Sequence, residues 1–318
     1  MVTVNKARGG GLSEISSIQQ LTIVMKFEQT IIRLFAFLVL LSAVPERIFS
    51  AKPIKYRVIS LQVGSQKQAD EYAPWAERCL QICRKLHHVN ADIVVLQGVD
   101  SLQLSDIIQG LPEYTVVTTK PVNGVIHSSV HPILYNSKRL RVLDRGSFSV
   151  DALTTEYSNV VADSTDVSWV YWGMFQDIKN GISMLAANTA MATEKDASRL
   201  KNWANAIKTQ LSKMTNKTPV LLTVSMLQDD SHPFYPIILS RFFQLEDSRK
   251  TADKVKGPMC TYNQWGQQEE PGLVTDYLFA SPSFHVSRFT VSESRVGERY
   301  YSSHHALIAE MKLDSSSF

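Results

Sequence analysis

The sequence predicts an α/β fold in which a few helices are spread between many strands. Residues 91–100 (ADIVVLQGVD) form a short, β-branched apolar run that ends in a glycine and polar residues, which is typical of a buried strand. Residues 56–63 and 219–224 repeat this pattern. Residues 75–87 and 196–214 instead place apolar side chains at helical spacing along one face. Strands interrupted by helices in this way indicate a layered α/β protein.

The remaining predicted elements are shorter. Residues 139–150 begin as a strand and are expected to turn at Gly146. A short helix over 102–110 is expected to end at Gly110, and a further helix is expected over 234–243. Additional strands are predicted at residues 114–119, 132–136, 167–175, 182–189, 276–280, 284–293 and 305–313.

Composition points to one ordinary globular domain. Of the 318 residues 44% are hydrophobic, and no repeat or linker follows residue 52, so we expect one domain over 52–314 and a tail at 315–318. The net charge of +3 lacks the basic footprint of a dedicated nucleic-acid binder. Three cysteines do not make a disulfide framework. Cys79 and Cys83, four residues apart in a predicted helix, are expected to face the core rather than to form a bridge.

Residues 1–51 are predicted to be an N-terminal extension and signal peptide. The apolar run at 34–44 has the length of a signal-peptide core and is short for a membrane span. Lys26 and Arg33 supply positive charge before it, and Met25 is the expected start. The alternative is that this segment is an uncleaved membrane anchor.

Two further features favour the secretory pathway. Ser50 and Ala51 offer small residues for cleavage after the apolar run. Asn216 begins an Asn-Lys-Thr triplet, which is an acceptor for N-glycosylation. We therefore expect a secreted or extracellular glycoprotein.

Short motifs follow one another in a characteristic order along residues 56–313. In chain order they are Arg57–Ser60, Trp75 with Arg78, Ala91–Ile93, Leu96–Gln97, Pro132–Tyr135, Asn188–Thr189, Arg199, Pro219–Leu222, Asp247–Arg249, Thr275–Phe279 and Ser302–Ala306. This order resembles the endonuclease/exonuclease/phosphatase superfamily, the fold of the DNase I-like nucleases and inositol-phosphate phosphatases. The resemblance implies a four-layer α/β/β/α sandwich, with two packed β-sheets flanked by helices and a site at one rim.

The resemblance also implies metal-assisted phosphoester hydrolysis. In this family a carboxylate cluster holds Mg²⁺, which neutralises phosphate charge. An Asp–His pair and an aspartate handle the nucleophilic water, and a second His and an Asn bind the phosphoryl oxygens.

This sequence departs from the family at most of these positions. The family's metal-binding Glu is replaced by Gly98, and its first Asn by the longer amide Gln62. The Asn-Thr-His motif ends in alanine, the Gly-Asp-Phe-Asn motif reads Val-Ser-Met-Leu, and the closing Ser-Asp-His reads Ser-Ser-His. The departures fall at Gln62, Gly98, Ala190, Ser225, Leu227 and Ser303.

Five side chains of the family's site remain as vestiges. Asp276 is either part of that site or a carboxylate that caps a strand end through backbone N–H groups. His304 lacks a carboxylate at position 303, which favours a solvated or core-satisfied imidazole. The five are Tyr135, Asn188, Arg199, Asp276 and His304.

Other polar and aromatic residues have plainer interpretations. Asp229 and Asp230 are expected in a solvated turn, with replacement metal ligands as the alternative. His127 and His131 lie in a predicted loop whose geometry the sequence leaves open. The tryptophans are expected in the core rather than on a ligand platform; they are Trp75, Trp169, Trp172, Trp203 and Trp265.

The absent catalytic groups favour a binding or structural module over an enzyme. An acid or base is worth about 10²–10⁴ in rate, and several are missing here, so little of an acceleration of about 10⁶ would remain. We expect no intact catalytic residue and no cofactor, with a protein partner or an extracellular assembly in place of nucleic acid. The alternative is a residual phosphoester hydrolase, which would need Mg²⁺.

Overall fold

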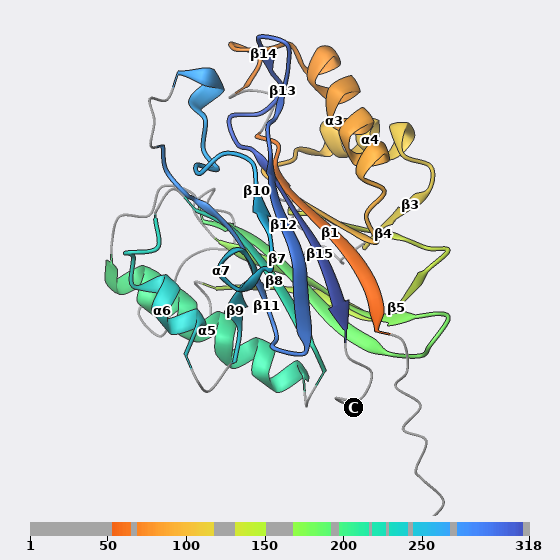
Figure 1. The fold of residues 1–318 in the computed structure, drawn as a ribbon, viewed down its shortest axis with the longest axis vertical. Coiled ribbons are helices and arrows are strands. Elements are labelled where there is room, and N and C mark those ends of the chain that lie inside the picture. The colour runs from red at the N-terminus through yellow and green to blue at the C-terminus, as the bar shows by residue number, and fades with distance from the viewer. Residues whose placement is uncertain are drawn as a thin grey trace, which may run out of the picture. The chain divides into compact units, whose positions relative to one another are not determined.

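Two β-sheets pack face to face in the computed structural model, with helices on the outer side of each sheet (Figure 1). This arrangement is the predicted four-layer α/β/β/α sandwich. The structure describes residues 53–64, 69–117, 131–150, 168–191, 197–215, 218–226, 229–240, 244–267 and 272–313.

The first sheet has seven strands in the order β10-β12-β15-β1-β2-β4-β3. Its centre is the parallel pair β1–β2, in which Gln62 is level with Gln97, and β15 runs antiparallel to β1. The strands are β1 (Ile54–Gln62), β2 (Ile93–Gln97), β3 (Tyr114–Val116), β4 (Ile133–Asn136), β10 (Val255–Lys256), β12 (Phe284–Ser292) and β15 (Ala306–Leu313).

The second sheet has six strands in the order β5-β6-β7-β8-β11-β9. Here β7 and β8 are parallel, and Ser225 of β8 is level with Ala190 on one side and Asp276 on the other. A separate hairpin joins β13 (Arg295–Val296) and β14 (Arg299–Tyr300). The strands of the second sheet are β5 (Leu140–Ser149), β6 (Trp169–Asp177), β7 (Ser183–Met191), β8 (Val220–Met226), β9 (Glu246–Asp247) and β11 (Asp276–Ala280).

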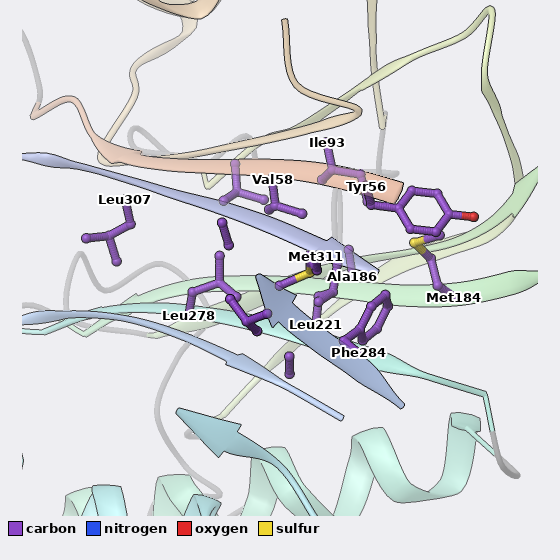
Figure 2. Packing of buried hydrophobic residues seen from close by; sticks show 14 of the residues in the cluster. Tyr56, Val58, Ile93, Met184, Ala186, Leu221, Leu278, Phe284, Leu307 and Met311 are labelled. Carbon is purple, nitrogen blue, oxygen red and sulfur yellow. The ribbon is translucent and has the colours of Figure 1, made fainter. Parts of the chain in front are cut away.

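Side-chain alternation along the strands divides the apolar core into three layers. In β1, Tyr56 and Val58 face the opposite sheet, whereas Ile59 and Leu61 face the helices, because successive side chains of a strand point to opposite sides. The middle layer lies between the sheets (Figure 2). It comprises Val58, Ile93, Leu307 and Met311 from the first sheet and Met184, Ala186, Leu221 and Leu278 from the second, among others.

The helices cover the outer faces of the two sheets (Figure 1). Helix α3 (Trp75–Val89) packs Ile82 and Leu86 against the first sheet, where a capping box of Asp100 and Gln103 starts α4 (Ser101–Gly110). The remaining helices are α5 (Ala197–Thr215), α6 (Phe234–Ile238) and α7 (Ser248–Thr251), and a 3₁₀ turn, η3 (Gln264–Gly266), contacts Tyr72 and Tyr300.

Two expectations about elements were wrong. Gly146 does not end its strand, since β5 continues through it and pairs Gly146 with Trp172. A Cβ at position 146 would lie 2.8 Å from the Trp172 ring, so this glycine makes room for an aromatic side chain rather than for a turn. The helix expected over 234–243 is shorter than predicted, since α6 ends at Ile238; residues 241–243 lie outside the described ranges.

Several predictions fall on residues outside the described ranges. These are the N-terminal extension with Met25 and the apolar run, His127, the glycosylation acceptor Asn216 and the Leu227 substitution. Among the described helices, none has the length and apolar character that a membrane crossing requires.

Candidate binding cleft

The core between the sheets becomes polar toward one end of the sandwich. The inward-facing positions of β1 change from Tyr56 and Val58 to Ser60 and then Gln62, and those of β7 and β8 change in the same way. Beyond this polar end lies a cleft of about 480 Å³. It is lined by Gln62, Gly64, Ala69, Tyr72, Ala190, Met191, Ser225, Met226, Tyr262, Gln264, Trp265, Gln267, Ser303 and His304.

His304, which lines this cleft, forms a buried pair with Asp276, which lies behind the lining. Nδ1 of His304 lies 2.8 Å from Oδ2 of Asp276, and the two side chains are 6% and 5% exposed. Asp276 also accepts hydrogen bonds from the hydroxyls of Ser225, at 2.7 Å, and Thr275, at 3.0 Å. With Nδ1–H donating to the carboxylate, Nε2 of His304 is left for a ligand.

This pair corrects two expectations. Asp276 does not cap a strand end through backbone N–H groups, because its carboxylate is bound by side chains. His304 is not without an orienting carboxylate, since Asp276 supplies it from the neighbouring sheet in place of position 303. Burial alone raises the pKa of Asp276, but the charge and hydrogen bond of His304 and the bond from Ser225 outweigh it and hold that pKa below its ordinary value.

The loop before His304 is held to a second loop across the cleft. The hydroxyl of Ser302 accepts from the His304 N–H at 3.0 Å, and the Ser303 carbonyl accepts from the Asn263 N–H at 2.8 Å. The Tyr262 ring lies 4.8 Å from the His304 ring, centre to centre. The cleft is therefore walled by two segments that hydrogen bonds fix to each other.

Asn188, a vestige expected at the site, is fully buried beneath the cleft. Its Nδ2 donates to the Leu96 carbonyl at 2.8 Å, and its Oδ1 accepts from Gln97 Nε2 and Thr223 Oγ1, each at 2.8 Å. Gln97 in turn donates to Ser60 at 2.9 Å. Asn188 thus joins the two sheets, and its polar atoms are engaged within the protein.

Two other vestiges do not line the cleft. Tyr135 packs in the middle core layer, with its ring 5.4 Å from that of Phe175. Arg199 lies on α5 with its guanidinium 4.7 Å from the centre of the Trp203 ring. Of the five vestiges, only His304 lines the cleft, and Asp276 is hydrogen-bonded to it.

Gly98, which directly follows β2, has a left-handed backbone conformation. Its φ is +64°, a value that favours glycine, and a Cβ there would lie 3.2 Å from Nε2 of Gln62. The Gly98 N–H donates to Nδ1 of His131 at 3.3 Å. Burial lowers the pKa of His131 to about 4, which keeps this imidazole neutral and able to accept.

The described donor set does not suit the Mg²⁺ that the resemblance implies. Ala190, Ser225 and Ser303 line the cleft without a carboxylate. Within the described ranges, no group of three or more His, Cys, Asp or Glu side chains is placed to hold a metal ion. The Asp229 carboxylate accepts a hydrogen bond from the Ser231 N–H, and Asp230 forms an ion pair with Lys250 at 2.7 Å. These contacts agree with the expectation that the two aspartates lie in a turn.

Sequence reasoning missed the aromatic wall of the cleft. Trp265, expected in the core, stacks on Tyr72 with ring centres 5.1 Å apart and planes 4° from parallel. The buried Arg78 guanidinium lies 5.3 Å from the Trp265 ring. No local pattern signals this contact, because the two rings come from segments nearly two hundred residues apart in the sequence.

The sequence matches no protein-family model and no curated protein. Solved structures, however, resemble this one closely in shape. An endonuclease/exonuclease/phosphatase family protein from Bacteroides thetaiotaomicron superposes with a TM-score of 0.73 at 22% identity, covering 83% of this chain and 99% of its own. This chain has the endonuclease/exonuclease/phosphatase fold.

Two further structures give the same result. An endonuclease/exonuclease/phosphatase from Bacteroides vulgatus has a TM-score of 0.74 at 23% identity, over 82% of this chain and 99% of its own. The mannosyl-6-phosphatase of B. thetaiotaomicron has a TM-score of 0.71 at 22% identity, over 80% of this chain and 99% of its own. At these identities the likeness establishes the fold, while function depends on the site.

Proposed function

We propose that the protein uses this fold to bind a ligand in the cleft without Mg²⁺-dependent hydrolysis. The observation that carries the proposal is the lining itself, in which Gln62, Ala190 and Ser303 stand where the resemblance calls for an asparagine, a histidine and an aspartate. Mg²⁺ is held by several oxygen ligands in near-octahedral geometry. Asp276 is already bound by three side chains, so it supplies no free carboxylate for that purpose.

A second candidate is a residual metal-dependent phosphoester hydrolase. The Asp276–His304 pair favours it, because an imidazole oriented by a carboxylate is a typical general base. One structure of this fold is a mannosyl-6-phosphatase, so hydrolysis of phosphoesters occurs on such a scaffold. Under this proposal the described residues supply the base but not the metal ligands.

Turnover assays separate the two candidates. The purified protein is incubated with Mg²⁺ or Mn²⁺ and with p-nitrophenyl phosphate, mannose 6-phosphate, DNA or RNA. The binding proposal expects product formation no faster than with the His304→Ala variant. The hydrolase would be established instead by turnover that EDTA removes and that His304→Ala and Asp276→Asn both abolish. The same turnover should be intact in the control variant Gln109→Ala, which changes an exposed residue of α4.

We further propose that the chain is secreted and glycosylated at Asn216, and that it binds a protein partner or takes part in an extracellular assembly. The apolar run at 34–44 supports secretion, and the Asn-Lys-Thr triplet supports glycosylation. Expression in a secreting eukaryotic cell tests both points. N-terminal sequencing of protein from the medium is expected to begin beyond residue 44, and Asn216→Gln is expected to remove a glycosidase-sensitive mass. An intact leader on membrane-bound protein would contradict secretion.

A further inference from the structure

The cleft differs from a phosphate site in its charge. Among its described lining residues there is no Lys, Arg, Asp or Glu, and the Nδ1 atom of the lining residue His304 is paired with Asp276. Phosphoryl groups are recognised by cations, metal ions and concentrated N–H donors. The cleft therefore suits an uncharged ligand better than a phosphorylated one.

The hydrogen-bonding groups of the cleft are amides and hydroxyls. Gln62, Gln264 and Gln267 line it, and each amide offers one acceptor oxygen and two N–H donors. Oε1 of Gln62 is buried and has no hydrogen-bond partner. An unpaired buried acceptor destabilises the protein, and a ligand hydroxyl would relieve this cost by donating to it. A doubly ionised phosphate has no proton to donate.

The wall of the cleft is aromatic and fixed in place. Tyr72, which is 48% exposed, stacks on Trp265, and Arg78 supports the Trp265 ring. Gln264 and Trp265 both have positive φ, at 48° and 59°. Non-glycine residues seldom adopt this conformation, so the surrounding contacts hold the segment in a strained state.

We propose that the ligand of the cleft is a neutral carbohydrate, which rests on the proposed binding function. A sugar ring has apolar C–H faces and a rim of hydroxyls that both donate and accept. One of its faces can stack on the exposed ring of Tyr72, which Trp265 supports from behind, and its hydroxyls match the three glutamines and Nε2 of His304. A nucleobase would stack equally well, but nucleic acid brings phosphates that the described lining has no cation to meet.

Calorimetric and tryptophan-fluorescence titrations of the full chain test this inference. The probes are the neutral mannotriose, cellotriose and chitotriose, compared with mannose 6-phosphate, inorganic phosphate and a short DNA oligonucleotide. At least one neutral trisaccharide is expected to bind in saturable fashion and to change the tryptophan emission. Mannose 6-phosphate is expected to bind more weakly than mannotriose.

Variants then place the binding in the cleft. Gln62→Met keeps the side-chain length but removes the amide, and Tyr72→Ala removes an exposed ring; each is expected to weaken binding about tenfold, or 1.4 kcal/mol. The matched control is Gln109→Ala, an exposed amide on α4 whose loss is expected to leave the affinity unchanged. Circular dichroism and thermal unfolding confirm that each variant is folded.

Each outcome bears on one proposal or the other. Failure of all three trisaccharides to bind at millimolar concentration overturns the carbohydrate inference, as does binding that Gln62→Met and Tyr72→Ala both leave intact. Preference for mannose 6-phosphate, phosphate or DNA at the same residues also overturns it but leaves a binding function in place. Mg²⁺-dependent turnover overturns the binding function itself.

Discussion

Asn188 stands at a position that the resemblance assigns to the site, and the structure gives it a role in packing. Its amide bonds Leu96, Gln97 and Thr223, which lie on strands of both sheets. A buried amide is stable only when its donors and acceptor are paired, and here the protein itself pairs them. The polar atoms of Asn188 are therefore satisfied within the protein itself.

Replacing Asn188 tests this structural role. Asn188→Ala leaves Gln97 and Thr223 without their shared acceptor in a dry interior, so we expect a loss of about 3 kcal/mol in the free energy of unfolding. Urea denaturation measures the loss. The exposed control Gln109→Ala is expected to stay within about 0.5 kcal/mol of the parent. A stable Asn188→Ala protein with altered ligand affinity would contradict the interpretation.

Asp276 predicts a specific pH dependence of stability. Its pKa in the folded state lies below the ordinary value of 3.8, because the charge and hydrogen bonds around it outweigh burial. A lowered pKa stabilises the fold above pH 3.8, and this contribution is lost as the pH falls through the folded-state pKa. We expect Asp276→Asn to be less stable than the parent at neutral pH and the difference to shrink below pH 3.8.

Urea unfolding at neutral and acidic pH measures this difference. Asp144→Asn, on the exposed face of β5, is the matched control and is expected to change stability little at either pH. A constant difference between Asp276→Asn and the parent across the acidic range would show that the carboxylate charge contributes nothing.

The sequence allowed part of this site to be predicted. Asp276 and His304 were singled out, but their hydrogen bond was missed because the partner was sought at the adjacent position 303. Pairing between residues on different sheets depends on register and sheet order, which a single sequence does not display. The contact between Tyr72 and Trp265 was not predicted for the same reason, since it joins residues that are far apart in the sequence.

At the scale of elements, the end of β2 sets what the cleft can contain. The family's Glu would stand at Gly98, where φ is +64°. A side chain in this conformation costs about 1–2 kcal/mol, and its Cβ would also meet the Gln62 amide. Restoring one carboxylate there would therefore strain the turn as well as change its charge.

The Gly98→Glu variant tests this argument. We expect a stability loss of about 1–2 kcal/mol and no Mg²⁺ binding by calorimetry, because the other metal ligands are still missing from the described residues. Gly98→Ala separates the backbone cost from the effect of the charge. Mg²⁺ binding at millimolar concentration or tighter in Gly98→Glu would show that the cleft had lost only this ligand.

Elements with strong periodicity were predicted well, and those defined by tertiary contacts were not. Helix α3 agrees with its pattern because its apolar residues recur at helical spacing on one buried face. The central strands β1, β2, β7 and β8 agree with theirs because burial on both faces selects apolar runs. The turn predicted at Gly146 was wrong because position 146 needs a glycine for a different reason: the Trp172 ring on the neighbouring strand leaves no space for a side chain. A turn and a close aromatic contact both call for glycine, and the sequence alone does not distinguish them.

At the scale of the molecule, the two ends of the sandwich differ in charge. Strand β1, nine residues long, runs from a basic end to the uncharged cleft, a distance of about 26 Å. At the basic end Arg139 pairs with Asp92 and Asp177, at 3.3 and 3.4 Å. The cations there surround a second hollow of about 650 Å³; they are Lys55, Lys138, Arg139 and Lys179.

This separation predicts weak binding of nucleic acid that does not involve the cleft. With a net charge of only +3, we expect no saturable binding of a labelled DNA duplex at physiological salt in fluorescence anisotropy. At low salt, any residual binding is expected to fall in the Lys138→Glu, Lys179→Glu double variant and to be unchanged in Gln62→Met. Binding that persists at physiological salt and disappears with Gln62→Met would place nucleic acid in the cleft. That result would contradict the conclusion that the lining selects uncharged ligands.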